Sequence, residues 1–414
     1  MKTFRPLTQL EQDLQLKLPA KKQTVYLDHA ATTPLDPSVR TAMLPFLETE
    51  FGNPSALYQP GRRAKEALSS ARENVAAILG CRPDELIFTG SGTESDNHAI
   101  FGVARAAKRA GRGRHIITSN IEHHAVLAAC EALEKEDFEV TYLESDEQGL
   151  ISTKQLRDAI REDTVLVSIM YANNEVGTIQ PIKELAAIAK EKHIPFHTDA
   201  CQAQGALTID VTELGVDLMT LNGSKIYGPK GVGVLFARKG VSLTPLIYGG
   251  AQESNRRAGT ENLASIVGFA KALEIADGMR TSESERLTKL RDYMTKELLR
   301  VLPKSRLNGH PTKRLPNNVH ISVLDVEGEA LLLYMDEFGI YAATGSACDS
   351  QTLDPSHVVI ALGLPYEFAH GSLRFTLGRL TTREQIDYVI EHLPGIIKAL
   401  RVISPLNLEL PNDK

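Results

Sequence analysis

The chain has 414 residues, of which 42% are hydrophobic and 24% are charged, and its formal net charge is -6 with a pI of about 6.1. These values are ordinary for a soluble protein of one or two domains, and they exclude the basic surface that nucleic-acid binding requires. No apolar run approaches the ~18 residues of a membrane span, and the N-terminus has no signal-peptide core. We therefore expect a cytoplasmic protein with no nucleic-acid or membrane partner.

Short β-rich runs alternate along the chain with longer segments of helical period. The expected strands lie at residues 86–89, 115–118, 139–143, 164–170, 194–199, 217–221 and 231–237. The expected helices lie at about residues 60–79, 94–110, 124–135, 153–161 and 182–192. This alternation predicts an α/β fold in which helices cover both faces of a mostly parallel seven-stranded sheet.

The pattern changes after about residue 280. A charged helical segment, "SERLTKLRDYMTKELLRVL", is followed by strand-like residues 317–324 and by the amphipathic "EGEALLLYMDEFG". A Gly/Ser-rich "TGSACDS", a strand in "SLRFTLG" and a helix over about 383–401 complete the sequence of elements. We expect a large domain over residues 35–280, and a smaller α+β domain formed by residues 1–34 and 281–414.

The four cysteines are widely scattered and include no CxxC pair, so neither a zinc site nor a disulfide framework is predicted. Cys81, Cys130 and Cys201 have small or apolar neighbours and are expected in or near the core. Cys348 is different, because it lies in the polar stretch "TGSACDSQTLDPSH". We expect it to be a reactive thiol.

In a parallel sheet, ligands bind at the carboxyl ends of the strands, so the residues that follow each strand are the candidates for a site. Gly92 and Thr93 open a helix in "GSGTESDN", where free N–H groups suit a phosphate, although plain helix capping explains the same residues. His123 and His124 begin the next helix, where an imidazole can stack on a planar ring or shuttle a proton.

Three further strand ends carry polar residues. The stretch "YANNEVGTIQP" holds Asn174, and "DACQAQG" holds Asp199 and Gln202. Lys225 lies in "LNGSKIYGPKGVG", where Gly and Pro favour a shaped loop over a helix or strand. An amine, a carboxylate, a phosphate cup and an imidazole are together the parts of a pyridoxal 5'-phosphate site, in which the lysine forms a Schiff base and the carboxylate pairs the pyridinium nitrogen.

The stretches "YLDHAATTP", "GNPSALY", "FTGSGTESDN", "EHHAVL", "NNEVGTIQPI", "HTDACQ", "GSKIYGPKGVG", "RRAGTEN", "TGSACDS" and "LRFTLGR" resemble the cysteine desulfurases. These enzymes belong to the class V aminotransferase group of fold-type I pyridoxal-phosphate enzymes. The resemblance runs from about residue 25 to 400 and is greatest to the iron–sulfur-assembly branch. It implies conversion of L-cysteine to L-alanine, with the sulfur captured as a persulfide on the enzyme.

The resemblance also implies a role for each matching position. The cofactor-binding residues that it implies are Gly92 and Thr93 for the phosphate, His123 for ring stacking and proton transfer, Asn174 beside cofactor and substrate, Asp199 for the pyridine nitrogen, Gln202 for the ring hydroxyl, Lys225 for the Schiff base, and Thr260 for the phosphate of a neighbouring subunit. Arg374 matches the residue that binds the substrate carboxylate, a task suited to a bidentate guanidinium. Cys348 matches the sulfur-accepting nucleophile.

Some positions depart from the family pattern. Asn222 and Ser224 stand where the family usually has Ser and His, and we expect both to bond the phosphate. Tyr58 stands where a His is common. Thr260 implies a homodimer, and Cys348 implies sulfur acceptors such as an iron–sulfur scaffold or a tRNA-thiolation protein. No metal site is predicted beyond a transient part for Cys348 in cluster transfer.

Three other interpretations stay open at this stage. The same scaffold supports selenocysteine lyase activity, and it supports other class V reactions such as transamination, in which Cys348 is idle. A catalytically inactive chain that only binds an assembly scaffold is the alternative from another functional class. The presence of Lys225, Asp199, His123 and Cys348 together argues against an inactive chain.

Overall fold

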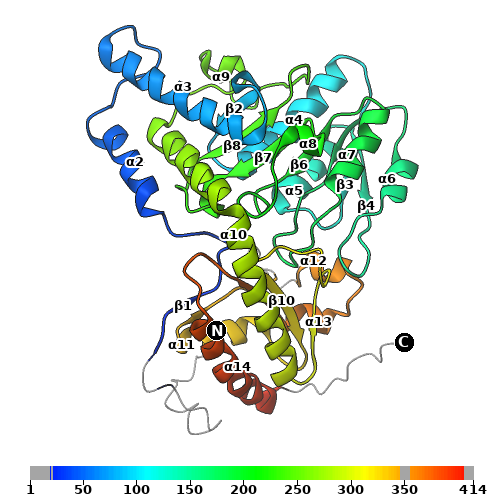
Figure 1. Cartoon of the computed structure of the whole chain (residues 1–414). Coiled ribbons are helices and arrows are strands. Elements are labelled where there is room, and N and C mark those ends of the chain that lie inside the picture. Colours follow the sequence, from blue (N-terminus) through cyan, green and yellow to red (C-terminus); the bar gives the residue numbers. More distant parts are fainter. Residues whose placement is uncertain (1–18, 20–21, 346–354, 405–414) are drawn as a thin grey trace.

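The computed structural model describes residue 19, residues 22–345 and residues 355–404. Its elements form a larger and a smaller part, which the long helix α10 (Leu263–Val301) connects (Figure 1). None of the described helices is long and apolar enough to cross a membrane.

The larger part is built on a sheet of seven strands. In spatial order these are β2 (Leu86–Thr89), β8 (Gly233–Ala237), β7 (Leu218–Asn222), β6 (Phe196–Asp199), β5 (Thr164–Ser168), β3 (His115–Ser119) and β4 (Glu139–Leu143). The pairs from β7 to β4 are parallel, whereas β8 is antiparallel to both of its neighbours. The predicted α/β fold with a mostly parallel seven-stranded sheet is therefore confirmed.

Successive residues of these strands face two different hydrophobic cores. Leu86 and Phe88 pack in one core, and Ile87 between them packs in the other. Because side chains alternate across a strand, a run that is apolar at every position needs cover on both faces. Helices provide that cover on both sides of the sheet.

Two helices pack in one of these cores, and the others pack in the core on the opposite face of the sheet. Those that pack with Ile87 are α4 (Gly92–Arg109) and α5 (His124–Glu134). Those that contribute to the opposite core are α2 (Pro37–Glu48), α3 (Gln59–Leu79), α6 (Thr153–Ala159), α7 (Ile182–Glu191), α8 (Val211–Leu214) and the first half of α10. The short 3-10 turns η1 (Pro83–Glu85) and η2 (Gly223–Lys225) and the helix α9 (Gln252–Asn255) join these elements.

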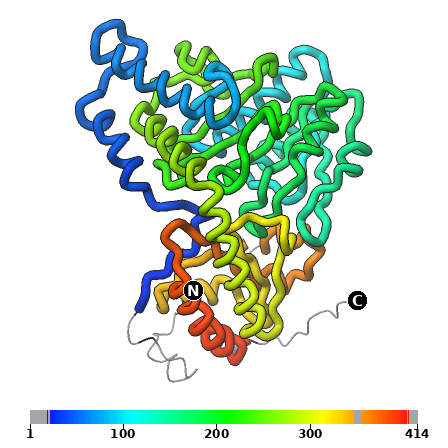
Figure 2. The backbone as a smooth tube through the Cα atoms, in the orientation of Figure 1, coloured from blue at the N-terminus to red at the C-terminus, as the bar shows by residue number. Residues whose placement is uncertain are grey.

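The smaller part is an antiparallel sheet with helices against it. Its strands are β9 (Ser305–Leu307), β10 (Asn318–Val323) and β12 (Ser372–Thr376), in the order β12-β10-β9. The helices that share its core are α11 (Gly328–Glu337) and α14 (Arg383–Ile403). The short helices α12 (His357–Ala361) and α13 (Tyr366–His370) precede β12 and contribute to the core of the larger part. The strand β1 (Val25–Tyr26) pairs in parallel with β11 (Ile340–Tyr341), so the first part of the described chain lies with the last (Figure 2).

Helix α10 contributes to both cores. Ile266, Phe269 and Leu273 pack in the core of the larger part, and Met294 and Leu298 pack in the core of the smaller part. A helix of 39 residues is about 58 Å long, which is enough to reach from one core to the other. The predicted domain boundary between residues 280 and 281 lies inside this helix, and it stays a prediction.

Most expected strands are found within two residues of their expected bounds, and the differences have local causes. The strand expected over 194–199 begins at Phe196, directly after Pro195, which has no N–H to donate to a ladder. The strand expected over 164–170 ends at Ser168, and Met170 lies instead in a pocket wall. Helix α2 and the first half of α10 had not been predicted.

A strained segment near β2 is stabilised by one buried ion pair. Glu253, Ser254 and Asn255 have positive φ angles of 46°, 59° and 63°, a conformation that costs about 1–2 kcal/mol for each such residue. Glu253 is buried, its Oε1 lies 2.5 Å from Arg72 Nη2, and its Oε2 accepts the N–H of Phe88 at 3.0 Å. These two contacts fix the Glu253 carboxylate within the strained segment.

We predict that Glu253→Gln lowers the free energy of unfolding by about 2–3 kcal/mol, because it leaves Arg72 without its charged partner. The apparent Tm, measured by circular dichroism, should fall accordingly. Asp84→Asn is the matched control, since its partner Arg82 is as exposed as Asp84 itself, and it should cost about 0.5 kcal/mol or less. Equal losses in the two variants would contradict this assignment.

Candidate active site

The carboxyl ends of the central strands border a pocket of about 240 Å³ between the two parts of the molecule. Nine of the predicted site residues line it, and they come from strand ends, helix starts and the smaller part. They are Gly92, Thr93, His123, Asn174, Asp199, Gln202, Asn222, Lys225 and Arg374. The structure therefore brings together residues that are up to 282 positions apart in the chain (374 minus 92).

One wall of the pocket is the N-terminus of α4. Ser91 caps this helix, because its hydroxyl accepts the N–H of Glu94 at 3.1 Å, and Gly92 and Thr93 form the first turn. The helix dipole and the first-turn N–H groups favour an anion here. Gly92 also lacks the Cβ that would lie 2.8 Å from Cys201 Sγ, so the backbone approaches the pocket closely.

Asn222 and Ser224 are joined by two hydrogen bonds next to the start of α4. The Asn222 Oδ1 accepts the N–H and the hydroxyl of Ser224, at 3.2 and 3.3 Å. The Asn222 Nδ2 remains directed toward the start of α4, since a Cβ on Gly92 would lie 3.4 Å from it. Asn222 thus lines the pocket as a donor, whereas Ser224 is not among the residues that line it.

Lys225 ends the 3-10 turn η2 and points to the segment between β1 and α2. Its Nζ donates to the carbonyl oxygens of Ala30 and Ala31, at 2.8 and 2.6 Å. Gln202 Nε2 donates to the same Ala30 oxygen at 3.0 Å. Ala30 and Ala31 had not been identified from the sequence, because they contribute only main-chain atoms, although they lie in the quoted stretch "YLDHAATTP".

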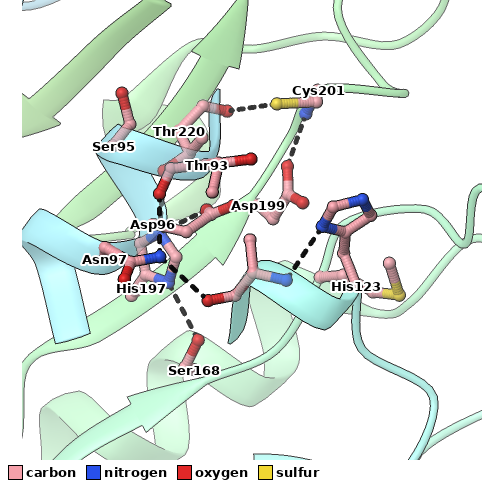
Figure 3. Close-up of polar contacts among 12 residues, drawn as sticks. Thr93, Ser95, Asp96, Asn97, His123, Ser168, His197, Asp199, Cys201 and Thr220 are labelled. Carbon is pink, nitrogen blue, oxygen red and sulfur yellow. Dashed lines mark hydrogen bonds and ion pairs between the residues drawn. The ribbon is translucent and has the colours of Figure 1, made fainter. Parts of the chain in front are cut away.

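Asp199 and His123 both line the pocket, at the end of β6 and after the end of β3, two strands that β5 separates (Figure 3). Asp199 is the last residue of β6, and its Oδ1 accepts the N–H of Cys201 at 2.9 Å. His123 caps α5, and its Nδ1 accepts the N–H of Ala125 at 3.1 Å, so the proton of the neutral ring is on Nε2. Burial lowers the pKa of His123 below its ordinary value; Asp199 opposes this shift and Lys225 adds to it.

Arg374 enters the pocket from β12 of the smaller part. It is 4% exposed, its Nη1 donates to the main-chain oxygen of Asn174 at 3.0 Å, and its Nη2 donates to Asp28 Oδ1 at 2.9 Å. Its Nε is buried and has no hydrogen-bond partner among the described residues. Asp28 was not among the residues identified from the sequence, and its carboxylate fixes the Arg374 guanidinium at the pocket edge.

Two predicted site residues lie elsewhere. Thr260 lines a separate cavity of about 190 Å³, together with Arg257, Glu253 and Gly90. Cys348 falls outside the described residues. Cys130 and Cys201 are buried, as expected from the sequence, and Cys81 is half-buried.

Residues 25–389 match the family model described as aminotransferase class-V. The chain is 53% identical to the cysteine desulfurase IscS of Methanosarcina thermophila over 386 residues, which are 93% of this chain and 95% of that protein. It is equally similar to IscS of Dictyoglomus turgidum, over 95% of this chain and 99% of the relative.

Solved structures agree with these sequence matches. A NifS-like protein superposes with a TM-score of 0.85 at 36% identity, covering 91% of this chain and 99% of that structure. SspA in complex with cysteine superposes with a TM-score of 0.76 at 37% identity, covering 86% and 99% of the two chains.

The pocket charges lead to a prediction about His123. In protein freed of small ligands, His123 should titrate below its ordinary pKa of about 6.5. Lys225→Met should raise that pKa by removing a nearby positive charge, and Asp199→Asn should lower it by removing a negative one, each by up to about one pH unit. NMR of isotope-labelled histidine rings measures both shifts.

His310 is an internal control in the same spectra, because its pKa is affected by burial and by Lys313 rather than by the pocket. Shifts of His123 in the same direction in both variants would be inconsistent with the pocket electrostatics described here.

Proposed function

The chain belongs to the class-V aminotransferase family and is a cysteine desulfurase, and from this premise we propose that its pocket binds pyridoxal 5'-phosphate and L-cysteine. The observation that carries the proposal is the convergence of Lys225, Asp199 and the N-terminus of α4 on one pocket of about 240 Å³. An amine, a carboxylate and an anion site are the three groups that this cofactor requires.

The residues present fit the cofactor at each of its polar ends. Thr93, the N-terminus of α4 and the Asn222 amide would hold the phosphate, and Gly92 leaves room for it at the backbone. Asp199 would pair with the pyridine nitrogen, and Gln202 would face the ring hydroxyl. His123 would stack on the ring, since it lines the same pocket from the start of α5. Ser224 would support Asn222 through their hydrogen bonds.

Lys225 would attach the cofactor covalently and then serve as a base. The carbonyl groups of Ala30 and Ala31 hold its Nζ in place within the pocket. When bound, the cofactor draws electrons from the bonds of the substrate Cα, which makes the proton on that carbon removable. Lys225 would move this proton, and His123, with its proton on Nε2, would act with it as an acid and base.

Arg374 would bind the carboxylate of L-cysteine. Arg374 lines the pocket, and each of its Nη atoms has a second N–H besides the one that Asn174 or Asp28 accepts, so the guanidinium can pair with a carboxylate. SspA, one of the similar structures, was solved with cysteine, and this supports cysteine as the ligand of the corresponding pocket here.

Cys348 would accept the sulfur. Its thiolate would attack the substrate sulfur to form an S–S bond, the C–S bond would break, and the electron pair would stay on the substrate carbon, which takes up protons to become L-alanine. The other cysteines are poor candidates, because burial raises the pKa of Cys81 and Cys130 to about 12 and that of Cys201 well above its ordinary value.

The partners and location of the enzyme are part of this proposal. We infer a homodimer in which Thr260 completes the phosphate site of the neighbouring subunit, and a cytoplasmic protein whose persulfide passes to an acceptor for iron–sulfur cluster assembly or tRNA thiolation. The position of Thr260, in a cavity apart from the pocket of its own chain, is consistent with a role toward another subunit.

Replacement of the proposed nucleophile tests the sulfur chemistry. Cys348→Ser should retain the cofactor absorbance and respond spectrally to L-cysteine, but its alanine release should fall by about 100-fold or more, because a hydroxyl is a far poorer sulfur acceptor than a thiolate. Mass spectrometry of the wild type after brief exposure to cysteine should find one added sulfur on the Cys348 peptide. Sulfur on Cys81, Cys130 or Cys201 instead, or wild-type turnover by Cys348→Ser, would refute the mechanism.

Reduction with borohydride tests the cofactor assignment. The purified protein should be yellow, and borohydride should fix the cofactor to the peptide that contains Lys225. Lys225→Ala should lose both the label and the activity, whereas Lys230→Ala, on the same loop, should keep both. A label that maps to Lys230 would show that the wrong lysine has been assigned.

A further inference from the structure

A buried carboxyl group lies at the pocket and has no part in the reaction described above. Asp96, in the "ESDN" stretch of α4, lines the pocket together with Thr93 and Asp199. It is 1% exposed, and its Oδ1 has no hydrogen-bond partner among the described residues. An ionised carboxylate in such a place would be costly unless a positive charge faced it.

The groups that the structure places around Asp96 do not provide that charge. Two are carboxyl groups themselves, Asp199 and Glu122. His197 Nε2 lies 3.7 Å from Asp96 Oδ1, but burial lowers the pKa of this histidine to about 4, so the ring is neutral. The hydroxyl of Thr220 also faces Asp96. Figure 3 shows Asp96, His197, Asp199 and Thr220 gathered in one small region between α4 and the strand ends.

Hydrogen bonds hold the neutral form of His197. Its Nδ1 lies 2.8 Å from Ser168 Oγ, and its Nε2 lies 3.1 Å from Thr220 Oγ1. Both partners are hydroxyl groups, which can donate to one ring nitrogen and accept from the other. The ring therefore needs no extra proton to satisfy its two nitrogens, and it offers Asp96 no cation.

Asp199 is better placed than Asp96 to carry the negative charge. It accepts the N–H of Cys201 at 2.9 Å and is 7% exposed, at the open end of its strand. Two carboxylates in one poorly solvated site do not both ionise readily, and the proton stays on the more buried group. Burial and the charge of Asp199 accordingly raise the pKa of Asp96 well above its ordinary value.

We propose that Asp96 carries a proton in the resting enzyme and thereby leaves Asp199 as the single anion opposite the pyridine nitrogen of the cofactor. Asp96 is then a positioning residue, which acts through Asp199 and not on the reacting atoms. A second anion would draw an additional proton into the pocket and weaken the pairing of Asp199 with the ring nitrogen. The identity of the cofactor rests on the proposed function, but the protonation of Asp96 does not.

Infrared spectroscopy of the holoenzyme near neutral pH tests the proton directly. With aspartate labelled by carbon-13 at the side-chain carboxyl, part of the protonated-carboxyl band should shift, and that part should be missing in Asp96→Asn. The amide is the neutral isostere of the protonated acid, so the variant should fold. If the variant does not fold, the carbon-13 shift in the wild type still shows whether an aspartate is protonated. A protonated band with no aspartate component, or a loss of ionised carboxylate in Asp96→Asn, would overturn the proposal.

Glu122→Gln is the matched control. Glu122 is fully buried, its Oε1 accepts from Ser119 and from the N–H of Met170, and burial raises its pKa to about 8. This variant should remove a glutamate component of the same band, which aspartate labelling does not move. The Asp96 component should remain.

The absorbance of the bound cofactor gives a second readout. The pH midpoint of its spectrum in Asp96→Asn should stay close to that of the wild type, because no charge has been removed. Asp199→Asn should lose the cofactor absorbance or shift the pH midpoint of that absorbance. A displacement of about one pH unit or more in Asp96→Asn would mean that Asp96 was ionised, which would overturn the proposal. If the protein binds no pyridoxal phosphate, the proposed function fails while the infrared result still decides the state of Asp96.

Discussion

Parallel pairing of the central strands is the constraint on which the pocket depends. Strands β5, β6 and β7 run in one direction, so the residues that follow them meet at one edge of the sheet. That edge collects Asn174, Asp199 and Lys225, which lie far apart in the chain. A helix N-terminus, that of α4, lies at the same edge because α4 also follows a strand end. The amine, the carboxylate and the anion site are thus consequences of one topology.

The smaller part completes this edge. The segment between β1 and α2 supplies the carbonyl groups that hold Lys225, and β12 supplies Arg374, which is fixed by Asp28. Helix α10 links the two parts, because its first half packs in the core of the larger part and its second half packs in the core of the smaller part. A shift of the smaller part relative to the sheet would therefore move Arg374 and the carbonyl groups that hold Lys225 together.

Burial shifts the pKa of several ionisable groups at the site. Burial lowers the pKa of His123 and His197, which favours their neutral rings, and it raises the pKa of Glu122 to about 8. Burial likewise raises the pKa of the three described cysteines, which disfavours their thiolate forms.

The sequence by itself determined the strand and helix periods, the fold class and the polar residues at the strand ends, because hydrophobic spacing and glycine-rich turns are local properties. It identified Lys225, Asp199, His123 and the start of α4 as candidates that the structure brings to one pocket, because each follows a strand or begins a helix. It did not identify Ala30 and Ala31, because only their main-chain oxygens contact Lys225. It also did not identify Asp28, because its partner Arg374 lies 346 residues away in the chain. Only the tertiary structure decided that Ser224 supports Asn222 instead of lining the pocket, and that Asp96 is buried beside Asp199. Distance in space and exclusion of water arise from packing, and they cannot be read from local spacing.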